Sequence, residues 1–325
     1  MQTYLITGGA GFIGSHLCAA LLKQGNRVIN IDNFDPFYDP LIKHNNIRHL
    51  ADNQNHILRK IDLRDREKLN EVFQSEPIDM VVHLAGMAGV RPSIENPILY
   101  EEVNIKGTMN ILECMKTFGI KKLIFASSSS VYGNRPEPAD FTEDMALNKM
   151  ISPYAITKKA GEDFCYLYHK LYDLTVLALR FFTVYGPGQR PDLAIHKFVQ
   201  LIDNHLPIPL YGDGSSMRDY SYIGDIINGI TQAANYLHQH KEVFEVINLS
   251  GNRSISLKNL LHIIEETLQQ KAIVNQLPMQ PGDVEATRAS IAKAQRLLHY
   301  EPQTTIEEGI RQFVAWYKNN KNNHA

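Results

Sequence analysis

The start of the chain constrains the fold more than any other stretch. An apolar run from Tyr4 to Thr7 leads directly into a turn with glycines at positions 8, 11 and 14, and a helical pattern begins near Phe12. Glycine permits the tight turn, lets a ligand approach the main chain and lets the helix pack closely on the strand. The free N–H groups at such a helix start attract phosphates. The alternative is that these glycines serve the turn alone.

Strand and helix patterns alternate over the first 180 residues. The short apolar runs are Tyr4 to Thr7, Arg27 to Ile31, His56 to Ile61, Met80 to His83, Leu123 to Ala126 and Val176 to Leu179. This alternation is typical of a parallel sheet with helices on both faces, which binds ligands beyond the carboxyl ends of its strands. We therefore expect an α/β protein with a doubly wound parallel sheet of the Rossmann type.

The composition and the pattern of the sequence change after Tyr185. Prolines cluster at positions 187, 191, 207 and 209, and scattered helical patterns with short strands follow. We expect residues 1–183 to form the Rossmann domain and residues 184–325 to form mostly a smaller, mixed α/β substrate-binding domain. The apolar run from Phe244 to Leu249 reads as a strand that returns to the main sheet.

Composition excludes several classes of partner. The 325 residues carry a formal net charge of −2, and no basic patch indicates nucleic acid. No run of 18 apolar residues indicates a membrane span, and the N-terminus does not resemble a signal peptide. The three cysteines, Cys18, Cys114 and Cys165, have neither a metal spacing nor a disulfide framework. We expect a cytoplasmic protein without a metal, in which the cysteines pack as small apolar residues.

Acidic residues at strand ends indicate which dinucleotide the turn binds. Asp32 ends the second apolar run, 18 residues after Gly14. A carboxylate there accepts hydrogen bonds from the adenosine ribose hydroxyls and repels a 2′-phosphate, which favours NAD over NADP. Asp62 either meets the adenine or caps a helix. His83 is either a packed strand residue or a catalyst.

The expected cofactor contacts combine the glycine turn, the strand ends and the Tyr/Lys pair described next. They are Gly8, Gly11, Phe12, Ile13, Gly14, Asp32, Asn33, Asp62, Leu63, Leu84, Ala85, Tyr154 and Lys158.

Tyr154 and Lys158 are four residues apart, so on a helix they share one face. A free tyrosine titrates near pH 10 and is a poor base at neutral pH. One cation about 4 Å away, at an effective dielectric constant of about 20, contributes roughly 4 kcal/mol, or about three pKa units. This pair is therefore a candidate acid/base for an alcohol. The alternative is an ordinary helical pair with a packed tyrosine and a solvated lysine.

Four serines, Ser127 to Ser130, follow the run from Leu123 to Ala126 and precede Val131-Tyr132-Gly133. Hydroxyls at the carboxyl end of a strand lie at the ligand crevice. They are therefore candidates for contact with a substrate. They can also be turn residues that satisfy backbone groups.

Together these motifs resemble the extended short-chain dehydrogenase/reductase family, in its nucleotide-sugar epimerase branch. The matching segments are Thr7 to Gly14, His83 to Ala85, Asn104 to Thr108, Ser127 to Gly133 and Tyr154 to Lys158. The resemblance implies that Ser128 bonds the sugar 4-oxygen, that Tyr154 is the base, and that Lys158 lowers its pKa while contacting the nicotinamide ribose. It assigns Asn104 a structural role. It also implies a homodimer formed through helices near Ile98 to Met115 and Pro153 to Tyr172.

A finer resemblance is to UDP-glucuronate 4-epimerases. The similar segments are Ala88 to Pro97, Leu179 to Pro187, Arg190 to Asp192 and Gln280 to Val284. The implied substrate-binding residues are Arg91, Ser127, Ser128, Ser129, Thr183, Arg190, Arg218, Asp283 and Arg288. For each arginine the alternative is a surface ion pair.

The resemblance implies inversion at C4 of a UDP-sugar through a transient 4-keto intermediate. Related decarboxylases and dehydratases carry an acidic residue just before Val-Tyr-Gly, where this chain has Ser130. The alternatives are a UDP-glucose or UDP-N-acetylglucosamine 4-epimerase, then a UDP-glucuronate decarboxylase. From a different class, a non-catalytic NAD-binding regulator remains an alternative.

Overall fold

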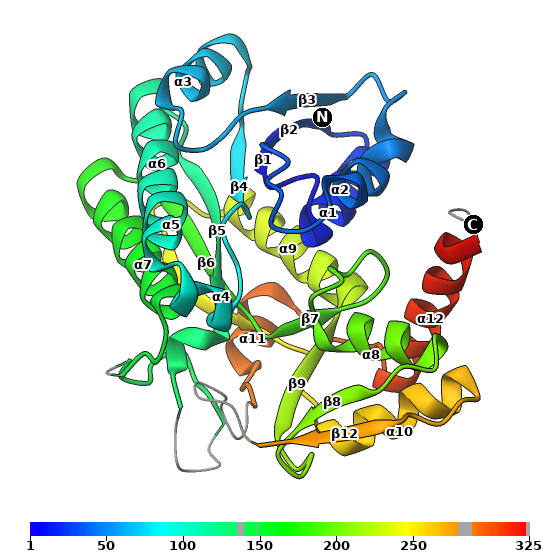
Figure 1. Cartoon of the computed structure of the whole chain (residues 1–325). Helices are drawn as coiled ribbons and strands as arrows, with labels where there is room; N and C mark the ends of the chain where they lie inside the picture. The colour runs from blue at the N-terminus through cyan, green and yellow to red at the C-terminus, as the bar shows by residue number, and fades with distance from the viewer. Residues whose placement is uncertain (135–139, 148, 279–287, 323–325) are drawn as a thin grey trace.

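The computed structural model describes residues 1–134, 140–147, 149–278 and 288–322, and its centre is one seven-stranded sheet (Figure 1). All its neighbouring strands run parallel, in the order β10-β6-β5-β4-β1-β2-β3. The strands are β1 (Thr3–Thr7), β2 (Arg27–Asp32), β3 (His56–Lys60), β4 (Met80–His83), β5 (Lys122–Ser128), β6 (Thr175–Phe181) and β10 (Phe244–Leu249). The predicted α/β class with a Rossmann-type doubly wound sheet is confirmed. The strand order reverses between β1 and β4, so ligands are expected beyond this point.

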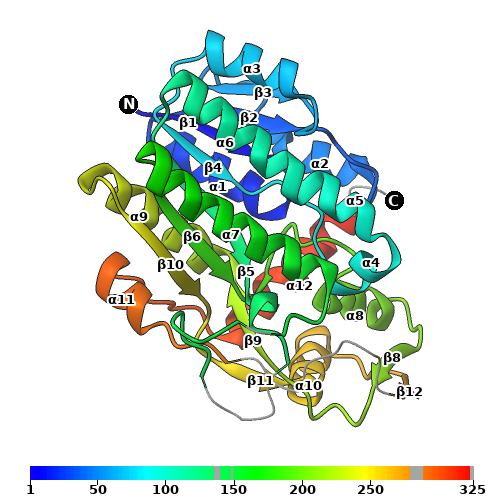
Figure 2. The ribbon, with the colours of Figure 1, turned by 90° about the vertical axis from the view of Figure 1, so that its left-hand side faces the viewer.

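Helices cover both faces of this sheet, because successive strand residues point to opposite faces. In β5, Leu123 and Phe125 enter the core under one helix layer, and Ile124 and Ala126 enter the core under the other. One layer contains α3 (Arg66–Ser75), α6 (Gly107–Phe118) and α7 (Pro153–Tyr172), which lie in front of the sheet in Figure 2. The other contains α1 (Phe12–Lys23) and α9 (Ile223–Gln239).

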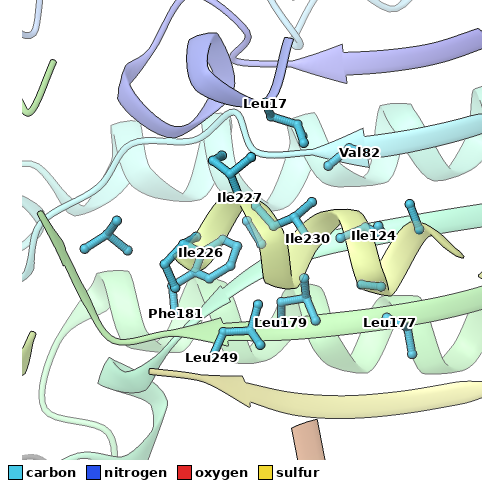
Figure 3. Close-up of a cluster of buried hydrophobic side chains, with 14 of the residues drawn as sticks. Leu17, Val82, Ile124, Leu177, Leu179, Phe181, Ile226, Ile227, Ile230 and Leu249 are labelled. Carbon is cyan, nitrogen blue, oxygen red and sulfur yellow. The ribbon is translucent and has the colours of Figure 1, made fainter. Parts of the chain in front are cut away.

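Figure 3 shows how α9 closes the second core. Ile226, Ile227 and Ile230 on one side of α9 point towards apolar residues of the strands, among them Ile124 and Leu179. As predicted from the sequence, the strand at residues 244–249, β10, returns to the large sheet and pairs in parallel with β6. The return of α9 to cover the same sheet was not predicted.

The remaining elements form a smaller layered unit with its own core. It has a three-stranded sheet of β11 (Ser254–Ser256), β9 (Met217–Tyr222) and β7 (Thr183–Tyr185), and a two-stranded sheet of β12 (Val274–Leu277) and β8 (Ile208–Tyr211). Around them pack α8 (Ala194–Asp203), α10 (Leu257–Leu268) and α12 (Ile306–Asn322). The short α11 (Ala292–Leu298) packs instead against α9 and β10.

Short helical segments complete the chain. They are α2 (Pro40–Ile47), a 3-10 turn (Arg48–Leu50), α4 (Val90–Glu95), α5 (Pro97–Tyr100), a π-helical segment (Glu101–Lys106) that runs into α6, and a 3-10 turn (Ser129–Tyr132) after β5. All three cysteines are buried in helices, as predicted. Across the described residues, none of the helices has the length and apolar character that crossing a bilayer requires.

Candidate active site

A cavity of about 630 Å³ lies along the carboxyl ends of the strands of the large sheet, and the smaller unit forms its other wall. The predicted residues that line it are Gly8, Gly11, Phe12, Ile13, Gly14, Asp32, Asn33, Asp62, Leu63, Leu84, Ala85, Arg91, Ser127, Ser128, Ser129, Tyr154, Lys158, Thr183, Arg190 and Arg218. Residues that are far apart in sequence therefore meet in one place.

The structure does not place the other two predicted substrate contacts, Arg288 and Asp283, among these lining residues. Arg288 does not line the cavity; its side chain is 64% exposed and its Nε lies 2.9 Å from Asp140 Oδ1. For this residue the structure has the surface ion pair that the sequence left as the alternative. Asp283, with the rest of Gln280 to Val284, lies outside the described residues.

The glycine turn is packed so closely against the neighbouring backbone that its key positions have no room for a side chain. Gly8 has a φ of +71°, and a Cβ there would lie 2.9 Å from the backbone of Ala85. A Cβ on Gly14 would lie 2.1 Å from the carbonyl oxygen of Gly8. The helix α1 starts after Gly11 without a side-chain cap, so its first N–H groups remain available for a phosphate.

Asp32 lies at the end of β2 and is buried. Its Oδ2 accepts from the N–H of Ala10 at 3.1 Å, and its Oδ1 accepts from the N–H of Phe34 at 2.8 Å. The buried Lys43 of α2 places its Nζ 3.6 Å from Asp32 Oδ1 and also lines the cavity. The local sequence pattern did not indicate Lys43, because this residue comes close to Asp32 only after α2 and the loop before it have folded.

Asp62 also lines this end of the cavity. The helix-cap alternative is wrong, because α3 begins at Arg66 and its cap is Asp65, which accepts from the N–H of Lys68. Hydrogen bonds from Arg64 and Asn33 lower the pKa of Asp62 to about 2, so the group is a carboxylate at neutral pH.

His83 is a packed strand residue. Its Nδ1 lies 2.7 Å from Thr7 Oγ1, and its Nε2 lies 3.0 Å from Thr108 Oγ1. Burial, together with the charge of Lys158, lowers the pKa of His83 to about 3, so the ring is neutral. It does not line the cavity.

Tyr154 and Lys158 share the first turns of α7, and Ser128 ends β5 beside them. The prediction that Lys158 lowers the pKa of Tyr154 is wrong for this arrangement. Burial raises the pKa of Tyr154, because the phenolate loses its hydration, while a hydrogen bond to Ser128 and the charge of Arg190 lower it. The Nζ of Lys158 instead donates to the carbonyl oxygen of Ala126 at 2.9 Å, and burial lowers the pKa of Lys158 to about 8.

Asn104 holds the helix that carries Tyr154. Its side-chain amide makes two hydrogen bonds to the backbone of Met87. The Oδ1 accepts from the Met87 N–H at 2.7 Å, and the Nδ2 donates to the Met87 carbonyl oxygen at 3.0 Å. It also donates to Thr157 Oγ1 at 3.0 Å. Asn104 lies in the π-helical segment, a deviation that often occurs at functional sites. The structural role implied for Asn104 fits these contacts.

A buried ion pair beneath the serines was missed from the sequence. Glu162 of α7 accepts two hydrogen bonds from Arg180 of β6, at 2.8 and 2.9 Å. Ser127 Oγ donates to the same carboxylate at 2.6 Å. Arg180 also donates to the Tyr132 hydroxyl, which donates to Asn248 of β10. Because the Ser127 hydroxyl donates its one proton to Glu162, it can only accept a hydrogen bond from a ligand.

Comparisons with known proteins agree with this site. The family model described as GDP-mannose 4,6 dehydratase matches residues 5–313. A UDP-glucuronate 4-epimerase from Thermodesulfobacterium geofontis is 42% identical over 98% of this chain and 97% of its own length. Two solved structures each match 98% of this chain. The UDP-glucuronic acid 4-epimerase from Bacillus cereus, in complex with UDP-glucuronic acid and NAD, has a TM-score of 0.92, 36% identity and full coverage of its own chain. The UDP-glucose 4-epimerase from Thermus thermophilus, in complex with NAD, has a TM-score of 0.87, 31% identity and coverage of 99% of its own chain.

These matches define the class of protein. The chain belongs to the extended short-chain dehydrogenase/reductase family, in its nucleotide-sugar epimerase branch.

Proposed function

We propose that this protein is an NAD-dependent UDP-glucuronate 4-epimerase that interconverts UDP-glucuronate and UDP-galacturonate. One observation carries the proposal. A single cavity brings the glycine turn and Asp32 together with Ser128, Tyr154 and Lys158, and with Thr183 and Arg190. The first group suits a dinucleotide, the second an alcohol, and the third a hexuronate. The relatives from Thermodesulfobacterium geofontis and Bacillus cereus bear this activity in their names.

Each residue near the sugar 4-position has its own role in the proposed reaction. Bound NAD would supply the acceptor, and later the donor, of a hydride at C4 of the sugar. Tyr154 takes the proton of the 4-hydroxyl and returns it, and Ser128 bonds the 4-oxygen. Lys158 donates to the cofactor ribose, while Ser128 and the charge of Arg190 favour the phenolate of Tyr154. Inversion requires the sugar to turn over between the two transfers, so binding is expected to concentrate on the UDP.

A 4-keto-hexuronate is a β-keto acid and loses CO₂ if its carboxylate aligns with the ketone π system. We assign Thr183, Ser129 and Arg190 to holding the carboxylate out of that alignment. Ser130 occupies the position of the acid in the related decarboxylases and dehydratases. Its Oγ is buried and has no hydrogen-bond partner among the described residues. No carboxylate therefore assists elimination from that position.

Products formed from UDP-glucuronate test the proposed function. Chromatography of the reaction is expected to show UDP-galacturonate, with no external NAD consumed. A UDP-pentose as the main product would instead identify a decarboxylase. Faster turnover of UDP-glucose or UDP-N-acetylglucosamine under the same conditions would refute the hexuronate assignment.

The Ser127 contacts predict unequal roles for neighbouring serines. Ser127→Ala is expected to change the KM for UDP-glucuronate by less than about threefold, because its proton is already donated to Glu162. Ser129→Ala removes a hydroxyl from the cavity wall and is expected to raise KM about tenfold. Steady-state kinetics of both variants check this. A larger KM effect at Ser127 would contradict the assignment.

Asp32 predicts the choice of dinucleotide. Asp32→Ser is expected to shift the ratio of NAD to NADP affinity by at least about tenfold towards NADP. The retained Lys43 ammonium, 3.6 Å away from the carboxylate in the parent protein, would meet the 2′-phosphate. The shift is expected to shrink in Asp32→Ser combined with Lys43→Met. Titration calorimetry with both dinucleotides measures it, and an unchanged ratio in Asp32→Ser would contradict the role of the carboxylate.

We assign residues 1–183, with β10, to cofactor binding and most of 184–325 to substrate binding.

We also propose that the protein is a homodimer. Apolar side chains are exposed on α5 and α7, which pack against each other; their exposed fractions are 68% for Ile98, 53% for Ile156, 45% for Leu167 and 59% for Leu171. Such a patch suits an interface between two copies. Light scattering is expected to give twice the 36.9 kDa chain mass, and Leu167→Lys with Leu171→Lys is expected to reduce it towards one chain. A parent mass of one chain would contradict the proposal.

A further inference from the structure

The loop that carries Arg190 is anchored on elements of the cofactor side of the cavity. His16 of α1 lies with its Nε2 2.8 Å from the carbonyl oxygen of Pro187. Gly188 has a φ of +79°, and a Cβ there would lie 3.5 Å from His16 Nε2 and 3.8 Å from Phe12. His16 and Phe12 belong to the helix that follows the glycine turn. The position of this loop therefore depends on the cofactor-binding unit.

The Arg190 guanidinium lies against two aromatic rings. Its Cζ is 5.1 Å from the ring centre of Phe37 and 5.9 Å from that of Tyr38, both within the range of cation–π contacts. Its Nε and Nη2 donate to Asp192 at 3.0 and 2.6 Å. Within the described parts of the chain, its Nη1 donates to no partner. The side chain is only 16% exposed and lines the cavity together with Tyr154.

The two rings come from the loop that follows Asp32. Phe37 is fixed there by its backbone N–H, which donates to Asp35 Oδ1 at 2.9 Å. Tyr38 lies under the ammonium of Lys43, 5.1 Å from its ring centre, and Lys43 in turn lies beside Asp32. One short loop thus contacts both the adenosine end of the cavity and the Arg190 guanidinium.

A planar guanidinium recognises a carboxylate with two parallel N–H groups, so its orientation determines its selectivity. Asp192 accepts from Nε and from one N–H of Nη2, and the rings restrict the plane of the guanidinium. This leaves Nη1 and the second N–H of Nη2 as a parallel pair for a ligand. We infer that Phe37 and Tyr38 are positioning residues, which orient Arg190 for the sugar carboxylate and thereby select a hexuronate over a hexose. This inference rests on the proposed function, since it assigns the carboxylate of that substrate to Arg190.

A purely structural role for the rings predicts a different result. Loss of packing in the loop after Asp32 would disturb Asp32 and Lys43, lower the NAD content and weaken both sugars equally. Positioning of Arg190 weakens only the sugar that has a carboxylate. The ratio of the two affinities therefore separates the two roles.

The test is a double-mutant cycle read by titration calorimetry, in a Tyr154→Phe background that prevents turnover. UDP-glucuronate and UDP-glucose are titrated into four proteins: the background itself, Phe37→Leu with Tyr38→Leu, Arg190→Met, and all three substitutions together. Tyr38→Phe alone keeps the ring and serves as the matched control. The NAD content of each preparation is measured after denaturation.

Removing both rings is expected to weaken UDP-glucuronate about tenfold and UDP-glucose less than about threefold, at unchanged NAD content. With Arg190→Met present, loss of the rings is expected to have no further effect on UDP-glucuronate. Tyr38→Phe is expected to bind like the background. Equal weakening of both sugars, or a full additive effect in the Arg190→Met protein, overturns the inference.

Turnover by the parent protein separates this outcome from failure of the proposed function. If the parent does not epimerise UDP-glucuronate but the rings still control its affinity through Arg190, the reaction is wrong and the positioning role stands. If the parent epimerises UDP-glucuronate and the affinity ratio does not respond to the rings, the inference fails alone.

Discussion

Tyr154→Phe is expected to lower kcat for UDP-glucuronate about a thousandfold, because it removes the group that accepts and returns the 4-hydroxyl proton. Only one oxygen atom is lost, and the ring keeps its edge-on contact with Tyr100, whose centre lies 6.3 Å away. The affinity for the UDP-sugar is therefore expected to change little. Product chromatography measures the rate, and titration calorimetry measures binding.

Tyr100→Phe is the matched control for this experiment. The Tyr100 hydroxyl donates to the carbonyl oxygen of Ala88 at 2.9 Å and does not line the cavity. Its loss is expected to change kcat by no more than a few fold. If Tyr154→Phe retained the parent rate, another group would have to be the base. If the parent bound the sugar but never converted it, the protein would be a non-catalytic regulator.

The second large effect is expected on stability, from Glu162→Gln. Glu162 and Arg180 are both 3% exposed, and the carboxylate accepts from Arg180 twice and from Ser127 once. Removing the charge of one partner leaves a buried guanidinium unpaired, which typically costs about 3–5 kcal/mol. Urea denaturation measures this as a loss of unfolding free energy at an unchanged slope.

Asp163→Asn, one residue further along the same helix, is the matched control. Its carboxylate is 68% exposed and pairs with Lys159 one turn earlier. Exposed pairs of this kind contribute less than about 1 kcal/mol. Similar losses in the two variants would contradict the assigned importance of the buried pair.

The places where prediction from the sequence failed share one physical cause. Spacing placed Tyr154 and Lys158 on one helix face, but it did not show that Lys158 would donate to Ala126, or that burial would raise the pKa of the phenol. Four serines after a strand indicated hydroxyls at a crevice, but not that Ser127 would donate to Glu162. Each failure concerns a partner that arrives from a distant part of the chain.

The sequence by itself determined the glycine turn, the parallel sheet, the acid at the end of the second strand, and the shared face of Tyr154 and Lys158. These depend on local backbone geometry and on periods of two and 3.6 residues, which a short stretch specifies. Only the tertiary structure decided that Lys43 lies beside Asp32, that Phe37 and Tyr38 lie against Arg190, and that Arg288 forms an exposed ion pair with Asp140. The reason is that hydration, charge and hydrogen-bond partners depend on which groups meet in space, and sequence spacing does not specify that.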